Sequence, residues 1–291
     1  MNFENVTKGI YLLKTPFSTV WTGVTLLTGE KNFLIDSGSE EPEVYVLPAL
    51  REIGMQPEDI DYVLHTHCHG DHISGHHTLA NKYGRRTAVL RQGYEYLRDP
   101  AGNAIRIRTK FPEHSPKPQT YLKGVEADVV LEENETLEGR LFAIHTPGHE
   151  GDAVCWYDIP TKTIICGDSL QANGTPTQGI GFYQDLSAYR QSLEKLEGYD
   201  IENIICGHEY DGIGSVITGR ENVKKALECC REYVALYDRK IRAYLSEGLT
   251  DQVAIAERLI AEVGCGRPGQ LFLALYTVTQ HLEEIENKNE G

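Results

Sequence analysis

The sequence predicts an α/β fold in which two β-rich halves form a sandwich of two sheets with helices outside, followed by a C-terminal helical extension. Short apolar, β-branched segments, separated by glycines and charged turns, fill the chain up to about residue 219. Two of them, 33–38 and 164–169, share one form: an apolar strand that ends in an acidic turn containing Gly and Ser. From Arg220 onward the apolar residues instead recur with helical spacing.

The elements follow from these patterns in chain order. In the first half we expect strands at 9–13, 20–27, 32–35, 61–65 and 87–90, with helices at 42–52 and 76–83. In the second half we expect strands at 127–131, 141–145, 153–157, 163–166 and 201–206, with a helix at 186–196. Residues 1–219 are therefore expected to form one domain and residues 220–291 a helical extension.

The extension begins with a stripe of apolar residues at alternating spacings of four and three, which predicts one buried face of a long helix. Its members are Val223, Leu227, Cys230, Val234, Tyr237, Ile241 and Tyr244. Two more helices are expected at 251–263 and 270–284. The stripe is interpreted as packing on the β core; a homodimer through these helices, or a subdomain that caps the substrate, is the alternative.

The segment 94–124 contains four prolines and six basic residues, and it is predicted to be a long irregular loop. Arg106 and Arg108 in this segment are candidate contacts for a carboxylate or phosphate of a substrate, and a solvated flexible loop is the alternative.

Composition limits the class of protein. The formal net charge of −15 argues against nucleic acid as the main partner, because phosphate backbones attract basic surfaces. The N-terminus lacks the pattern of a signal peptide, and no run of eighteen apolar residues predicts a membrane span. The seven cysteines are scattered, without CxxC spacing, as in proteins of a reducing compartment. We expect a cytoplasmic protein with a small-molecule substrate.

The strongest chemical signal is the string HTHCHGDH at 65–72. It places His67, His69, Asp71 and His72 directly after a predicted buried strand. Imidazole and carboxylate are ligands that suit divalent zinc, iron or manganese. Four such residues within six positions are hard to explain by packing alone, so the string predicts a metal site.

Further candidate ligands stand at the ends of three later strands. His149 follows a strand in TPGH, Asp168 follows the next in CGD, and His208 follows the last in CGH. In each case a glycine precedes the candidate ligand, which allows the backbone to turn sharply and approach a metal.

The order HxHxDH, TPGH, GD and GH resembles the metallo-β-lactamase superfamily over residues 1–219. The resemblance implies a four-layer αββα sandwich with the site at one edge, between the halves. It implies that His67, His69 and His149 bind one metal and that Asp71, His72 and His208 bind a second. It implies that Asp168 bridges the two metals. It also implies that Asp36 supports the ligands without binding metal. Zinc is the expected metal, and iron or manganese are the alternatives.

Such a two-metal site suits hydrolysis, because the ions lower the pKa of bound water and can hold a bridging hydroxide as the nucleophile. Asp71 is expected to orient the hydroxide and take up its proton. Asn173 and Tyr183, close after Asp168, are candidate substrate contacts. No organic cofactor is expected.

One short segment bears on the bond that is cleaved. The segment GHEY at 207–210 resembles glyoxalase II, a thioester hydrolase that also carries a C-terminal helical domain. An ester, thioester or lactone hydrolase is therefore expected. The alternatives are a phosphodiesterase of the same fold and a non-hydrolytic di-iron redox protein. Redox members typically carry glutamate in place of His69 and add a flavin domain, and the sequence shows neither feature.

Overall fold

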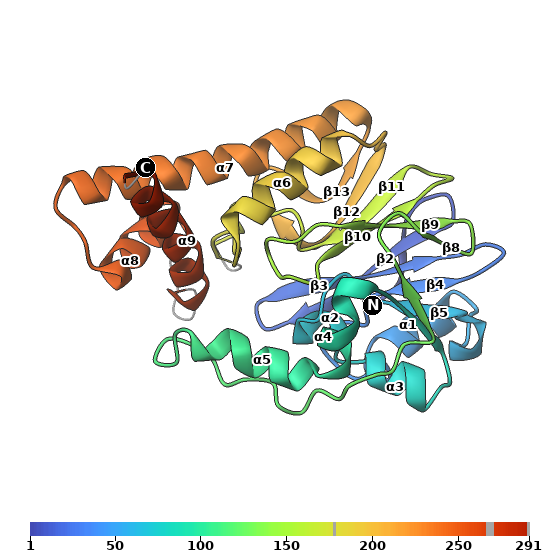
Figure 1. The fold of residues 1–291 in the computed structure, drawn as a ribbon. Coiled ribbons are helices and arrows are strands. Elements are labelled where there is room, and N and C mark those ends of the chain that lie inside the picture. Colours follow the sequence, from blue (N-terminus) through green and yellow to red (C-terminus); the bar gives the residue numbers. More distant parts are fainter. Residues whose placement is uncertain (177–178, 266–270, 290–291) are drawn as a thin grey trace.

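The structure is a computed structural model that describes residues 1–176, 179–265 and 271–289. Two β-sheets pack face to face and helices cover their outer faces (Figure 1). The predicted αββα sandwich with C-terminal helices is confirmed. In the described ranges, no helix is both long and apolar enough to cross a membrane.

The first sheet is built from the N-terminal half, and its strands lie in sequence order. They are β1 (Glu4–Thr7), β2 (Ile10–Phe17), β3 (Val20–Leu27), β4 (Phe33–Ile35), β5 (Tyr62–Leu64), β6 (Arg86–Leu90) and β7 (Val129–Leu131). The pairs from β1 to β4 are antiparallel, and those from β4 to β7 are parallel. Parallel pairing brings the carboxyl ends of β4 and β5 to the same edge of the sheet.

The second sheet has the order β13-β12-β11-β10-β9-β8. Its strands are β8 (Thr136–Leu137), β9 (Leu141–His145), β10 (Val154–Asp158), β11 (Thr163–Gly167), β12 (Asn203–Tyr210) and β13 (Gly214–Thr218). β11 and β12 run parallel, and the other neighbours are antiparallel. The parallel pair brings the ends of β11 and β12 together, as β4 and β5 do in the first sheet.

Apolar side chains on both faces of the first sheet hold the layers together. Leu12 and Leu27 point to the second sheet, where they belong to the same buried cluster as Trp156. Their neighbours Leu13 and Leu26 point to the opposite face, as the period of a strand requires. There they pack with α1 (Val46–Glu52) and α3 (His76–Asn81).

The remaining helices of the sandwich connect strands or cover the second sheet. They are the short α2 (Gly70–Ile73), α6 (Leu186–Glu197), and the 3-10 turns η1 (Pro57–Asp59) and η2 (Arg91–Gly93). The apolar side of α6 lies in one buried cluster with residues of β9 to β12.

The expectation of an irregular loop over 94–124 is wrong for residues 94–109. They form α4 (Tyr94–Arg98) and α5 (Pro100–Thr109). Pro100 occupies the first turn of α5, where a missing backbone N–H leaves no helical hydrogen bond unmade. The side chain of Asp99 caps this helix and accepts a hydrogen bond from the backbone N–H of Gly102 at 2.9 Å. One of the prolines is thus a helix start, and residues 110–128 contain no helix or strand.

The C-terminal helices share their core with the second sheet. α7 (Arg220–Ser246) begins at the predicted domain boundary, and every member of the predicted apolar stripe is buried. In Figure 1, α7 runs over the second sheet and beyond it, and α8 (Gln252–Glu262) and α9 (Leu271–Asn289) turn back toward α5. The predicted helices at 251–263 and 270–284 correspond to α8 and α9, although residue 270 lies outside the described residues. Dimerisation through these helices stays a prediction.

Asn173 ties the sandwich to this extension. Its Nδ2 donates to the carbonyl oxygen of Val263 at 2.9 Å, and its Oδ1 accepts a hydrogen bond from the hydroxyl of Tyr237 at 2.8 Å. Replacing Asn173 with Ala is expected to lower the free energy of unfolding by about 2 kcal/mol, because the buried hydroxyl of Tyr237 and the partly buried carbonyl of Val263 would each lose a hydrogen bond. Urea unfolding measures this change. Asn222→Ala, which removes an exposed bond to the Thr218 carbonyl, is the control, and equal losses in the two variants would contradict the assignment.

Candidate metal centre

The seven candidate ligands converge at one edge of the sandwich. His67 and His69 lie in the turn after β5, and Asp71 and His72 lie on α2. The other three come from the second half. His149 follows β9, Asp168 follows β11, and His208 lies within β12. The chain therefore folds so that ends of strands from both sheets deliver the predicted residues to one place.

The ligand atoms of these residues form overlapping groups whose members lie within 4.8 Å of one another. The groups are His67, His69 and His149; His67, His72 and Asp168; and Asp71, His72 and His208. The structure thus brings together all seven residues that the sequence indicates.

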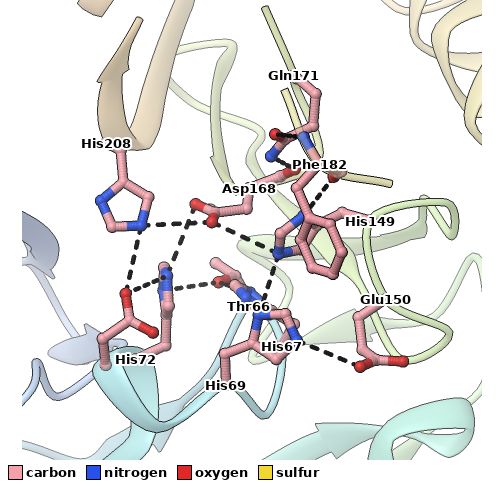
Figure 2. Close-up of polar contacts among 12 residues, drawn as sticks. Thr66, His67, His69, His72, His149, Glu150, Asp168, Gln171, Phe182 and His208 are labelled. Atoms are coloured by element: carbon pink, nitrogen blue, oxygen red, sulfur yellow. Dashed lines mark hydrogen bonds and ion pairs between the residues drawn. The ribbon is translucent and has the colours of Figure 1, made fainter. Parts of the chain in front are cut away.

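Asp168 connects the groups. Its Oδ2 lies 3.5 Å from Nε2 of His149 and 3.3 Å from Nε2 of His208. Its Oδ1 lies 3.6 Å from Nε2 of His72. Figure 2 shows the imidazoles of these three histidines directed toward the one carboxylate from different sides.

Backbone carbonyls fix the orientation of two of the rings. Nδ1 of His149 donates to the carbonyl oxygen of Phe182 at 2.8 Å, and Nδ1 of His208 donates to that of Trp21 at 2.7 Å. A proton held on Nδ1 leaves the lone pair on Nε2, the atom that faces the cluster. Metal-binding histidines are commonly oriented by such hydrogen bonds.

Asp36 orients a third ring. Its Oδ2 accepts a hydrogen bond from Nδ1 of His72 at 2.8 Å, and its Oδ1 accepts one from the backbone N–H of Thr66 at 2.7 Å. Its backbone has φ +62°, in the left-handed region that residues other than glycine seldom adopt. Asp36 therefore contacts a candidate ligand from outside and belongs to none of the three groups.

The electrostatics of the cluster favour a cation. Burial lowers the pKa of His149 to about 4, which keeps its imidazole neutral and its lone pair available. Burial also lowers the pKa of His72, but the charges of Asp36, Asp71 and Asp168 outweigh this effect and raise it to about 9. A proton on His72 is thus held by three carboxylates, and an ion of positive charge would be stabilised in the same way.

Buried atoms without a hydrogen-bond partner provide an independent test of fit. Among the residues that the structure describes, such unpaired atoms in the cluster include Nε2 of His67, Nε2 of His72 and Oδ1 of Asp168. Because buried polar atoms are normally paired, their convergence needs an explanation. A divalent metal ion satisfies such atoms, and this nitrogen and oxygen donor set suits zinc, iron or manganese. The residues fit the metal site that the sequence predicts.

Glu150 is a residue of the site that the sequence reasoning missed. Its side chain is only 2% exposed and contacts Nε2 of His69 at 3.2 Å through Oε2. Nδ1 of His69 then faces Nε2 of His149 at 3.1 Å. The signal was its position directly after a candidate ligand, in the string PGHE. Arg106 binds the other oxygen of Glu150 at 2.7 Å, so its charge is already paired.

The four candidate substrate contacts lie in different environments. Tyr183 is buried, and its hydroxyl is hydrogen-bonded to Nε2 of His281 at 2.6 Å. Neither Tyr183 nor Asn173 is among the described residues that line the cavity at the cluster, whereas Arg108 is. Arg106, engaged by Glu150, does not line it either.

This cavity has a volume of about 250 Å³ and opens above the cluster. Its floor includes His69, Asp71, His149, Asp168 and His208. Its walls come from the β2–β3 turn, from α5, and from the start of α9. The C-terminal extension therefore contributes directly to the space in which a substrate would meet the cluster.

Comparison with known proteins identifies the family of this chain and gives the same fold as the structure. Residues 17–208 match the model of the metallo-beta-lactamase superfamily. A metallo-beta-lactamase family protein from Thermus thermophilus superposes with a TM-score of 0.73 at 20% identity, covering 98% of this chain and 95% of that one. A beta-lactamase domain protein from Burkholderia ambifaria gives 0.75 at 17% identity, covering 99% and 88%. At these identities the likeness shows the fold.

Among curated relatives, a hydroxyacylglutathione hydrolase from Pelagibacter ubique is 28% identical over 164 residues, which are 56% of this chain and 57% of the relative. An uncharacterised protein of Bacillus subtilis is 29% identical over 179 residues, 55% of this chain and 71% of that protein. This chain thus spans a little over half the length of the hydrolase that it matches.

The glycine before His208 generates a prediction about the cluster. A Cβ at Gly207 would lie 2.5 Å from Oδ1 of Asp168 and 2.7 Å from Cε1 of His72. Gly207→Ala is therefore expected to displace both ligands and to weaken metal binding by about 10- to 100-fold while the chain still folds. Metal titration followed by elemental analysis, with circular dichroism as the folding check, measures this. Gly198→Ala, at the end of α6, is the control, and wild-type metal affinity in Gly207→Ala would disprove the close packing.

Proposed function

This chain belongs to the metallo-beta-lactamase superfamily and is a metal-dependent hydrolase, and we propose that it hydrolyses a small-molecule ester, thioester or lactone with two divalent metal ions. The observation that carries the proposal is that the Asp168 carboxylate lies at the floor of a cavity within 3.3 to 3.6 Å of His72, His149 and His208, which between them belong to all three groups of ligand atoms. A carboxylate between two sets of imidazoles could contact both members of a pair of metal ions, and such pairs catalyse hydrolysis.

In this proposal the ligands divide as the resemblance implies. His67, His69 and His149 would hold one ion, Asp71, His72 and His208 would hold the other, and Asp168 would serve both. Ions bound there would polarise a substrate carbonyl and lower the pKa of a water molecule. We assign zinc as the metal on the basis of the nitrogen-rich donor set, with iron or manganese as the alternatives.

The chain itself positions the reacting groups. Oδ2 of Asp71 accepts a hydrogen bond from the hydroxyl of Thr22 at 2.9 Å, which fixes the carboxylate where it borders the cavity. From this position Asp71 can orient an attacking water and accept its proton. Phe182 stacks against His69 with ring centres 6.2 Å apart and covers that side of the cluster with an apolar surface. Such a surface limits the access of bulk water to the reacting centre.

Support for an acyl bond comes from the relatives and from one segment. The relatives from Pelagibacter ubique and Enterobacter are named as hydroxyacylglutathione hydrolases. Tyr210, the last residue of the GHEY segment, lines the cavity, and its hydroxyl accepts a hydrogen bond from Nε2 of Gln171 at 3.0 Å. A thioester is accordingly the first bond to test.

Removing the shared carboxylate tests the two-metal assignment. Asp168→Ala is expected to reduce bound metal to fewer than two ions per chain and to lower kcat by at least about 1000-fold, because both ions lose a ligand. Elemental analysis and initial rates measure the two effects. Asp200→Ala, which removes an exposed carboxylate paired with Arg220, is the control. Full activity in the Asp168 variant would show that the ligand set is wrong.

A hydrolysis panel tests the bond. Thioester, lactone, aryl ester, phosphodiester and β-lactam compounds are supplied to the metal-loaded protein, and we expect turnover of one or more of the first three. Turnover of the phosphodiester alone would instead favour a phosphodiesterase. Turnover of none, together with two bound irons, would contradict hydrolysis and favour the redox alternative.

A further inference from the structure

The wall of the cavity above the cluster carries a positively charged side chain. Among the described residues that line it, Arg108 on α5 is the one lysine or arginine. Its Nε is buried and has no hydrogen-bond partner among the described residues. Its guanidinium carbon lies 5.6 Å from the ring centre of Phe272, the second residue of α9. Arg108 is therefore held against an aromatic ring, and no carboxylate of the described part of the chain is bonded to it.

Arg106, two residues earlier on the same helix, provides the contrast. Two positions on an α-helix are about 200° apart, so the two arginines leave α5 in different directions. Nη2 of Arg106 is bonded to Oδ1 of Asn103 at 2.7 Å and to Glu150 at 2.7 Å. The charge of Arg106 is thus paired with Glu150, whereas Arg108 forms no ion pair with any residue of the described ranges.

An arginine that is partly buried without an acidic partner is costly unless an anion joins it. The two carboxylates on the cavity floor, Asp71 and Asp168, already face the histidines of the cluster. Burial lowers the pKa of Arg108, and the charge of Asp71 only partly opposes this effect. Within the described residues the guanidinium therefore has no acidic partner, and an anionic ligand in the cavity would supply one.

The rest of the wall is largely apolar. It includes Phe17, Val20, Ile107, Ile180, Phe182 and Phe272. A single cation in such a wall matches a ligand with one negative charge and an apolar body. A carboxylate fits better than a phosphate monoester, because its two coplanar oxygens match the guanidinium fork and its single charge needs no further cation.

From these observations we infer that the substrate carries a carboxylate at its non-reacting end, and that Arg108, stacked on Phe272, binds it. The remaining part of the substrate crosses the apolar wall, and its ester, thioester or lactone carbonyl lies at the metal centre. α5 and α9 together form this acid-binding subsite, so it is a specificity determinant that lies outside the seven ligands. The inference rests on the proposed hydrolysis.

The test uses phenyl esters of one short aliphatic chain that ends in a carboxylate, a carboxamide or a phosphate, with metal-loaded protein. Arg108→Gln is expected to lower kcat/KM for the carboxylate by on the order of 100-fold, because a charge-assisted bidentate pair is lost. The carboxamide ester should be hydrolysed at nearly the same rate by both proteins. Arg108→Lys should recover only part of the loss, since an ammonium cannot form the bidentate pair. Arg91→Gln, which removes an exposed arginine paired with Glu132, is the control.

A binding measurement makes the inference testable without turnover. Hexanoate should raise the melting temperature of the wild-type protein more than hexanamide does, and Arg108→Gln should remove most of that difference. A hexanoate effect that persists in Arg108→Gln would place the carboxylate on the metals and overturn the inference. So would equal loss of activity on the carboxylate and carboxamide esters, or a preference of the wild type for the phosphate. Absence of all ester turnover, with Arg108-dependent hexanoate binding intact, would contradict the proposed hydrolysis and leave the acid-binding subsite standing.

Discussion

The carboxylate of Asp168 is the point on which the arrangement of this molecule depends. It lies between imidazoles carried by α2, by the turn after β9 and by β12, at distances of 3.3 to 3.6 Å. These elements belong to different sheets, so the two halves of the sandwich must be held in register for the contacts to exist. Buried charge of this density is unfavourable without compensation. The apolar cluster between the sheets, centred on residues such as Trp156, supplies the rigidity that keeps it in place.

A second set of residues maintains the geometry of the cluster from outside. Asp36 holds His72, Glu150 holds His69, and backbone carbonyls hold His149 and His208. Each partner fixes one ring nitrogen, so the other nitrogen is left to face the centre. Because these partners come from the residue after β4, from the TPGHE turn, from β3 and from the segment at Phe182, the site draws on contacts across the whole sandwich. The positioning of the ligands is therefore a property of the fold and not of the HxHxDH string alone.

The convergence of the seven candidate ligands could be predicted from the sequence because each signal is local. Four are encoded within 67–72, and the other three follow a strand and a glycine. The layered fold was predictable for the same reason, since strand and helix periods are read in short windows. The edge strands β1, β8 and β13 were missed because they are partly polar and only partly buried. Asn173 and Tyr183 were interpreted as substrate contacts, but their polar atoms meet residues about 60 to 100 positions away, which no local pattern reveals.

Another long-range cluster shapes the cavity wall, and most of it lies away from the candidate metal ligands. Ile107, Phe182, Phe272 and Tyr276 form one apolar cluster between α5, the segment after β11 and α9, and the hydroxyl of Tyr276 donates to the carbonyl oxygen of Ile107 at 2.7 Å. Of these, Phe182 also contacts the rings of His69 and His149. The cluster thus shapes one wall of the cavity while the seven ligands depend on strand ends elsewhere. Changes at Arg108 or in α9 can therefore alter which molecule reaches the candidate metal centre without altering its ligands, which is how one ligand set can serve different substrates.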